Sequence, residues 1–168
     1  MRKEIMKSKK KYLIAIMLFS LLLSSCSNNS VKPQKVPDIS KAKDAADVQE
    51  LMKATPFKTE KNKESGISAE TYDKSNFAGY DGELSYFYGE DGSVLYYKWF
   101  INEKTEKEAK KIYADVCEVL KGSYGEGTES NNKASKLYTT SFTNDKQQIT
   151  AQLQGNDSGW EISYTVTG

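Results

Sequence analysis

The 168-residue sequence contains no histidine and only two cysteines, Cys26 and Cys117. Ser-His-Asp and Cys-His machinery and histidine metal sites are therefore excluded, because each needs an imidazole as base or ligand. There is no G-x-x-x-x-G-K-[ST] loop, and no G-x-G-x-x-G follows a strand-like segment, so the common phosphate-binding loops are missing as well. We expect no catalytic residues, no cofactor and no bound metal.

The sequence also lacks a long hydrophobic run. Its longest, residues 12–23, is well short of the roughly 20 apolar residues that a membrane-spanning helix needs. A basic segment precedes the run, and its charges are Arg2, Lys3, Lys7, Lys9, Lys10 and Lys11 against a single Glu4. This order is typical of a cleaved signal peptide, predicted here at residues 1–25.

Leu23-Ser24-Ser25-Cys26 follows the apolar run directly. This tetrapeptide resembles the lipobox of bacterial lipoproteins, and the resemblance covers the first 26 residues. It implies that the Cys26 thiol receives a diacylglycerol, that a signal peptidase cuts before Cys26, and that palmitate-type acyl chains anchor the chain to the bacterial cell membrane. The folded part would then face the extracytoplasmic side. An ordinary secretory signal and an uncleaved anchor are the alternatives.

Removal of the signal peptide changes the charge of the protein. Of 24 Lys and Arg, six lie in residues 1–25, and of 23 Asp and Glu only one does, which leaves 18 basic and 22 acidic side chains and a net charge of −4. With the signs interspersed there is no basic patch, so we expect no nucleic-acid partner. Residues 26–43 are polar and hold two of the three prolines, which predicts a flexible tether behind the lipidated end.

Acylation of Cys26 would leave Cys117 without a disulfide partner. Its neighbours Ile112, Val116 and Leu120 recur at the spacing of a helix face. We therefore interpret Cys117 as a buried free thiol, which behaves as a small hydrophobic side chain.

Two helices are predicted. Thr105 and Glu108 form a capping box ahead of a 3.6-residue apolar period, and Gly122 supplies a stop, which predicts a long helix at 105–121. A shorter helix is predicted at 44–54, where the apolar residues that share a face are Val48, Leu51 and Met52.

The remaining apolar segments are strand-like and are separated by Gly, Asp and Asn turns. Two hairpins with four-residue loops at 89–92 and 155–158 are predicted, with further strands at 67–72 and 135–142. The expected cross-strand pairs are Tyr86 with Leu95, Leu84 with Tyr97, Glu83 with Lys98, Leu153 with Trp160 and Ala151 with Ile162.

These elements predict a single α+β domain at 44–168, with an antiparallel sheet packed by one long and one short helix. The halves 44–101 and 105–168 resemble each other in element order, which suggests a tandem α-β-β-β repeat. Such a layout is similar in outline to the β-lactamase-inhibitor proteins and to small outer-membrane-assembly lipoproteins. This likeness is one of architecture and implies no role for any residue.

The predicted pairing leaves an aromatic strip on the side of the first hairpin that faces away from the core. Its residues are Phe87, Val94, Tyr96 and Phe100. An uncovered strip of this kind is typical of a surface that contacts a protein or a glycan. The alternative is that the 73–82 segment or the tether covers it.

We therefore expect a membrane-anchored extracytoplasmic lipoprotein with a non-catalytic binding domain. One alternative is a carboxylate-based enzyme or metal-dependent envelope factor, which would need several of the acidic residues Asp73, Asp81, Glu83, Asp91 and Asp157 to converge. Another is a lipoprotein that captures a small ligand, which would need a deep cavity.

Overall fold

The computed structural model describes residues 34–168, apart from the side chain of Lys74. The predicted cleavage site and Cys26 lie outside the described residues. The helical elements are η1 (Ile39–Lys41), α2 (Ala45–Met52) and α3 (Glu106–Tyr124). The strands are β1 (Lys58–Lys61), β2 (Ser68–Phe77), β3 (Tyr80–Tyr88), β4 (Val94–Glu103), β5 (Thr128–Asn132), β6 (Leu137–Thr143), β7 (Gln148–Asn156) and β8 (Gly159–Thr167). The α+β class with one long and one short helix is confirmed.

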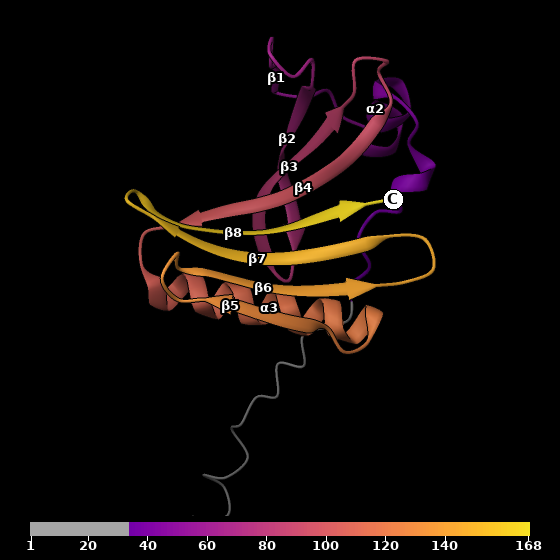
Figure 1. The fold of residues 1–168 in the computed structure, drawn as a ribbon. Helices are drawn as coiled ribbons and strands as arrows, with labels where there is room; N and C mark the ends of the chain where they lie inside the picture. The colour runs from indigo at the N-terminus through magenta and orange to yellow at the C-terminus, as the bar shows by residue number, and fades with distance from the viewer. Residues whose placement is uncertain (1–33) are drawn as a thin grey trace, which may run out of the picture. The chain divides into compact units, whose positions relative to one another are not determined.

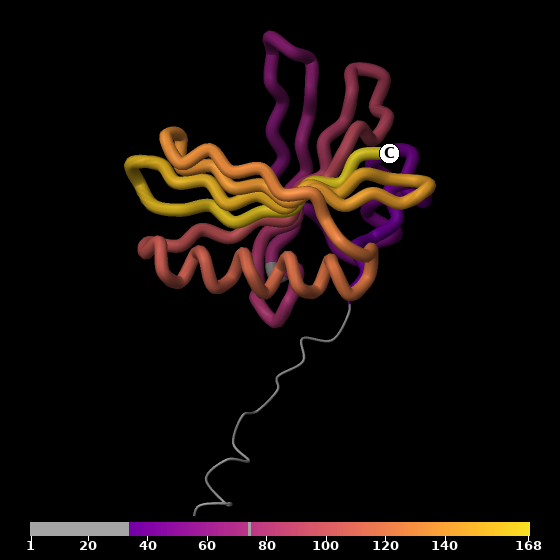
Figure 2. The backbone as a smooth tube through the Cα atoms, turned by 60° about the horizontal axis from the view of Figure 1, so that its bottom comes forward, coloured from indigo at the N-terminus to yellow at the C-terminus, as the bar shows by residue number. Residues whose placement is uncertain are grey.

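All the described strands form one antiparallel sheet in the order β1-β2-β3-β4-β8-β7-β6-β5. Each half is a helix followed by a four-stranded meander, and the last strands of the two halves, β4 and β8, pair at the centre. The sheet is strongly twisted, so that β1–β3 run steeply across the direction of β6–β8 (Figures 1 and 2).

One face of the sheet carries the core. Helix α3 packs on this face against β6, β7 and β8 (Figure 2), and the side chains that it buries are Ala109, Ile112, Val116, Val119 and Leu120. At the β4–β8 seam the rings of Trp99 and Tyr164 stack with centroids 5.7 Å apart, and the indole N–H of Trp99 donates to the carbonyl of Ser75 at 2.7 Å. Aromatic packing therefore joins the two halves.

Both helices are present, with differences at their ends. The Thr105 hydroxyl accepts the Glu108 N–H at 3.3 Å, as the capping box predicts. The predicted stop at Gly122 is wrong, because α3 continues to Tyr124 and is capped by Gly125, whose φ of 84° suits glycine. The prediction that Leu51 shares the apolar face of α2 is also wrong, since the side chain is 41% exposed.

The predicted pairs of both hairpins are wrong by two residues. Tyr86 pairs with Tyr97 because the β3–β4 loop is one residue longer than predicted and Leu95 forms a bulge. Leu153 pairs with Ile162 because the β7–β8 turn is a tight one at Asp157 and Ser158. The other pairs observed in place of those predicted are Leu84 with Trp99, Glu83 with Phe100 and Ala151 with Tyr164. A shift of two preserves the face of a side chain, so most core assignments hold, but the bulge leaves Leu95 43% exposed.

The sequence predicts three strands in each half, and the structure has four. Strands β1 and β5 are additional edge strands on which every residue is exposed. They carry no alternating apolar pattern, which is the signal that strand prediction uses. The matching order of elements agrees with a tandem arrangement, now as α-β-β-β-β, and duplication of an ancestral half stays a hypothesis.

Residues 34–43 pack on the domain, so the flexible tether predicted at 26–43 is wrong for this part. Val36, Ile39 and Ala42 are buried in the core. The Tyr97 hydroxyl donates to the carbonyl of Pro37 at 2.5 Å, and the η1 turn is capped by Asp38. These three apolar residues are spaced three apart, but the segment contains a proline and lacks the length of a regular helix, so its composition predicts a tether.

Candidate functional site

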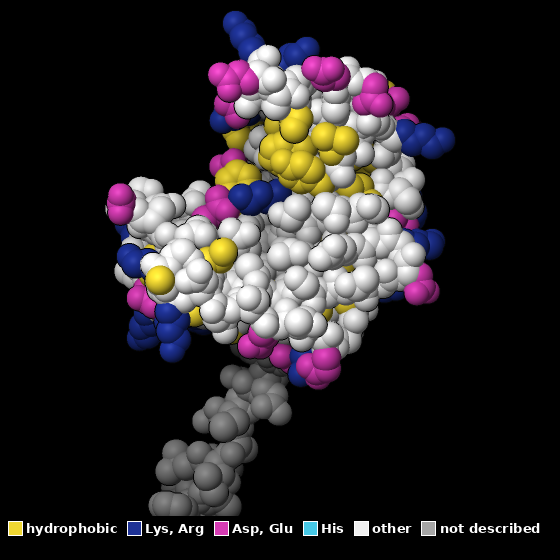
Figure 3. All heavy atoms as spheres, in the orientation of Figure 1, with side chains coloured by type: hydrophobic (Ala, Val, Ile, Leu, Met, Phe, Trp, Pro, Cys, Tyr) yellow, Lys and Arg dark blue, Asp and Glu magenta, His cyan; other side chains and the backbone are white. Residues whose placement is uncertain are grey.

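The second face of the sheet has no helix of the described chain packed on it (Figures 1 and 3). On β6–β8 its side chains are nearly all small hydroxyls and amides. These are Leu137, Thr139, Ser141, Thr143, Gln148, Thr150, Gln152, Gln154, Glu161, Ser163, Thr165 and Thr167. The single charge, Glu161, is neutralised by Lys98 at 2.6 Å. The β6–β8 part of this open face is therefore low in charge, as the central parts of protein interfaces are.

A hydrophobic patch lies on the β2–β4 part of the open face (Figure 3). The rings of Phe87 and Tyr96 stack there with centroids 4.4 Å apart and an interplanar angle of 15°. Together with Ile67 and Ala69 they form the apolar wall of a hollow of about 430 Å³, whose polar wall comes from the β1–β2 hairpin. The aromatic pair is thus accessible beside a concave surface.

The other two residues of the predicted strip differ in position. Phe100 lies on the open face, with the Lys98 ammonium 5.5 Å from the centre of its ring. Val94 is wrongly assigned to this face, because the bulge at Leu95 reverses the alternation and pairs Val94 with the core residue Tyr88. We define the aromatic patch as Phe87, Tyr96 and Phe100.

The segments expected to cover the patch do not do so in the described part of the chain. Residues 73–82 continue β2 and begin β3, with a tight turn at Ala78 and Gly79. Residues 34–43 pack on the core side of the sheet. Within residues 34–168, the aromatic patch is therefore open.

The acidic residues considered for catalysis or metal binding do not all converge. Asp73, Asp81 and Glu83 lie in the β2–β3 hairpin, away from the turns that hold the other two. Asp91 binds Ser93 within the β3–β4 loop, and Asp157 lies in the β7–β8 turn at another corner of the sheet (Figure 1). Asp81 accepts a hydrogen bond from Asn76 at 2.8 Å. Within residues 34–168 no group of three or more Asp, Glu or Cys side chains is placed to hold a metal ion.

Cys117 is a free thiol, as predicted, but it is only partly buried. It contacts the edge of the core beside Tyr113, whose hydroxyl lies 2.8 Å from that of Thr140. Burial raises the pKa of the Cys117 thiol, which disfavours the nucleophilic thiolate.

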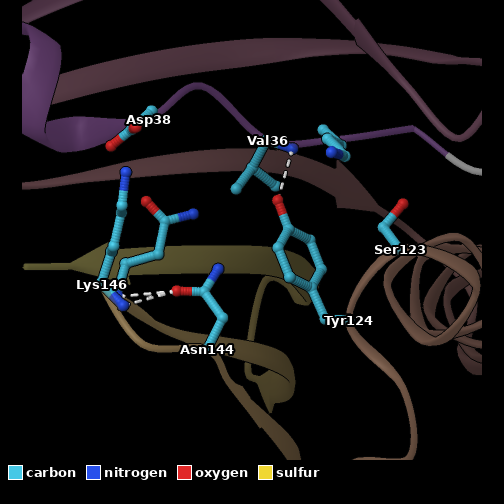
Figure 4. A pocket seen from close by; sticks show the side chains of 8 residues that line it. Val36, Asp38, Ser123, Tyr124, Asn144 and Lys146 are labelled. Atoms are coloured by element: carbon cyan, nitrogen blue, oxygen red, sulfur yellow. Dashed lines mark hydrogen bonds between the residues drawn. The ribbon is translucent and has the colours of Figure 1, made fainter.

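A second site, a polar pocket of about 380 Å³, has no signal in the sequence (Figure 4). Three segments that are distant in the sequence form it: the N-terminal segment, the last turn of α3 and the β6–β7 turn. Its lining residues are Lys35, Val36, Asp38, Ser123, Tyr124, Asn144, Lys146 and Gln147. No motif unites these residues, because only the fold brings them together.

Hydrogen bonds fix the walls of the polar pocket. The Val36 N–H donates to the Tyr124 hydroxyl oxygen at 3.1 Å, which ties the N-terminal segment to α3. The Asn144 side-chain oxygen accepts the N–H groups of Lys146 and Gln147 at 2.8 and 2.9 Å, which shapes the turn (Figure 4). Hydrogen bonds within the chain therefore hold the backbone that lines the pocket.

Comparisons with protein-family models, with curated proteins and with solved structures give no match for this chain. No described helix is long and apolar enough to cross a membrane. The function must therefore be inferred from the two sites themselves.

Proposed function

We propose that the protein is a membrane-anchored extracytoplasmic lipoprotein whose domain binds a partner protein through the open face of its sheet. The anchor rests on the sequence alone: a basic start, a short apolar run and Leu23-Ser24-Ser25-Cys26. The binding role rests chiefly on one structural observation, the stacked and half-buried Phe87 and Tyr96 rings that line a hollow on a sheet face without a covering helix in the described chain.

The surroundings of the aromatic patch support a protein as the partner. Interface cores are rich in aromatic side chains and poor in charge, and the patch adjoins a field of Ser, Thr and Gln side chains in which the one ion pair is internal. A partner can cover this area without stripping water from unpaired charges, which would cost several kcal/mol for each ion.

The anchor is tested by replacing Cys26 with alanine in cells. We expect the wild-type chain in the membrane fraction, with an acyl group on the N-terminal residue of the mature protein in a mass spectrum. The Cys26→Ala chain should leave the membrane fraction or accumulate with its signal uncleaved. An unmodified Cys26 in a wild-type chain that is already soluble would refute the anchor.

The binding face is tested by cross-linking in intact cells. The variant Phe87→Ser/Tyr96→Ser removes the stacked pair, and Leu51→Ser is the matched control because Leu51 is an exposed apolar residue on α2. We expect a cross-linked neighbour that is retained by the control and lost by the double variant, with both variants folded by circular dichroism. Identical neighbours for all three chains would refute the binding face.

A further inference from the structure

The polar pocket contains a buried acceptor without a partner. Gln147 is 7% exposed, and its side-chain Oε1 makes no hydrogen bond. A buried unsatisfied oxygen is destabilising, and folded proteins rarely keep one without a reason. Gln147 lines the pocket, so a donor that enters the pocket can reach this oxygen.

A donor lies beside this acceptor. The Tyr124 oxygen accepts the Val36 N–H and also faces the Gln147 side chain. Burial raises the pKa of Tyr124, so its phenol keeps a proton that it can donate. A neighbouring acceptor and donor match a hydroxyl group, which can serve both at once.

The charges that line the pocket are unequal. Lys35 and Lys146 contribute two positive charges, and neither has an ion-pair partner within 4 Å among the described residues. Asp38 contributes one negative charge, since hydrogen bonds from Ser40 and then the charge of Lys146 hold the pKa of its carboxyl below the usual value. The lining therefore carries an excess of one positive charge, and in Figure 4 the Lys146 side chain extends along the pocket toward Asp38.

We propose that this pocket binds a small anion that carries hydroxyl groups, such as a phosphorylated polyol or a sugar acid. The lysines hold the phosphate or carboxylate, and Tyr124 and Gln147 hold a hydroxyl. A volume of about 380 Å³ lies at the lower end of the range for ligand pockets. The proposal is independent of the anchor and of the binding face.

Isothermal titration calorimetry of the purified full chain in mild detergent tests the ligand class. The probes are glycerol 3-phosphate and glucuronate. Glycerol and glucose test the hydroxyl groups alone, and inorganic phosphate tests the charge alone. We expect both probes to bind at least about tenfold more tightly than any of the three partial ligands, since each probe makes both a charge-assisted contact and a hydroxyl contact. Affinity for inorganic phosphate equal to that for glycerol 3-phosphate would overturn the proposal, as would no binding by either probe.

Variants locate the binding. Lys35→Gln/Lys146→Gln should weaken the affinity for the probes by at least about tenfold. Lys133 is an exposed lysine in the β5–β6 turn, at the opposite end of β6, and Lys133→Gln should leave the affinity unchanged. Gln147→Met should weaken binding of the hydroxylated probe and leave the affinity for phosphate unchanged. An equal loss with Lys133→Gln would overturn the site. Phe87→Ser/Tyr96→Ser should bind the probe normally, which separates this pocket from the open face.

Discussion

Replacing Ile39 with alanine distinguishes a packed N-terminal segment from a tether. Ile39 is 7% exposed in the η1 turn and lies in the core cluster with Val36 and Ala42. The change removes three carbon groups worth about 0.8 kcal/mol each, and the cavity that remains adds to this cost. We expect a loss of about 2–4 kcal/mol in the free energy of unfolding, which corresponds to a fall in Tm of roughly 5 to 15 °C.

Urea denaturation of the full chain in mild detergent, followed by tryptophan fluorescence, measures this loss. Lys41→Ala is the matched control, because Lys41 is exposed in the same turn and its removal should change stability by no more than about 0.5 kcal/mol. Equal stability of Ile39→Ala and wild type would refute the packing, and the segment would then be the tether that its composition suggests.

Two further predictions concern the sheet. Burial raises the pKa of Tyr86 to about 12 and that of Tyr97 still higher, so unfolded chains release these protons first, and stability should be full below pH 10 and fall above it by about 1.4 kcal/mol per pH unit for each such tyrosine; a free energy of unfolding that stays constant between pH 10 and pH 12 in urea denaturation would contradict this. Leu84→Ala should cost about 2–5 kcal/mol in urea denaturation and Leu95→Ala less than about 1, because Leu84 is buried and the bulge exposes Leu95; equal losses would contradict the bulge.

The parts of the fold that periodicity encodes could be predicted. The 3.6-residue spacing on α3 and the alternation on β3, β4, β7 and β8 arise because each element buries one face. The fold class, the order of the elements along the chain and most core residues follow from these patterns. The pairing could not be predicted to the residue. A slip of two residues keeps every side chain on its face, and only the loop geometry at Ser93 and Asp157 distinguishes the alternatives.

The two candidate sites differ in how far the sequence reveals them. Phe87, Tyr96 and Phe100 lie on the open face as the alternation predicts. The assignment of Val94 to that face is wrong because a bulge has no reliable sequence signal. The polar pocket has no local signal at all, since Asp38, Tyr124 and Gln147 come from three distant segments. Its orphaned amide oxygen is a property of the packed state alone.

The packing of residues 34–43 also constrains where a partner can be. With Cys26 as the proposed anchor, only eight peptide units separate it from Gln34, whose side chain donates a hydrogen bond to the carbonyl of Asn76. A fully extended chain of that length spans at most about 29 Å, which is less than the roughly 60 Å available to a tether that ran to residue 43. A partner of the open face would therefore lie close to the bilayer surface. Lengthening the linker between Cys26 and Gln34 by about 20 Gly and Ser residues should add cross-linked neighbours that lie farther from the membrane. An unchanged set of neighbours would mean that the open face, and not the anchor, determines which proteins are cross-linked.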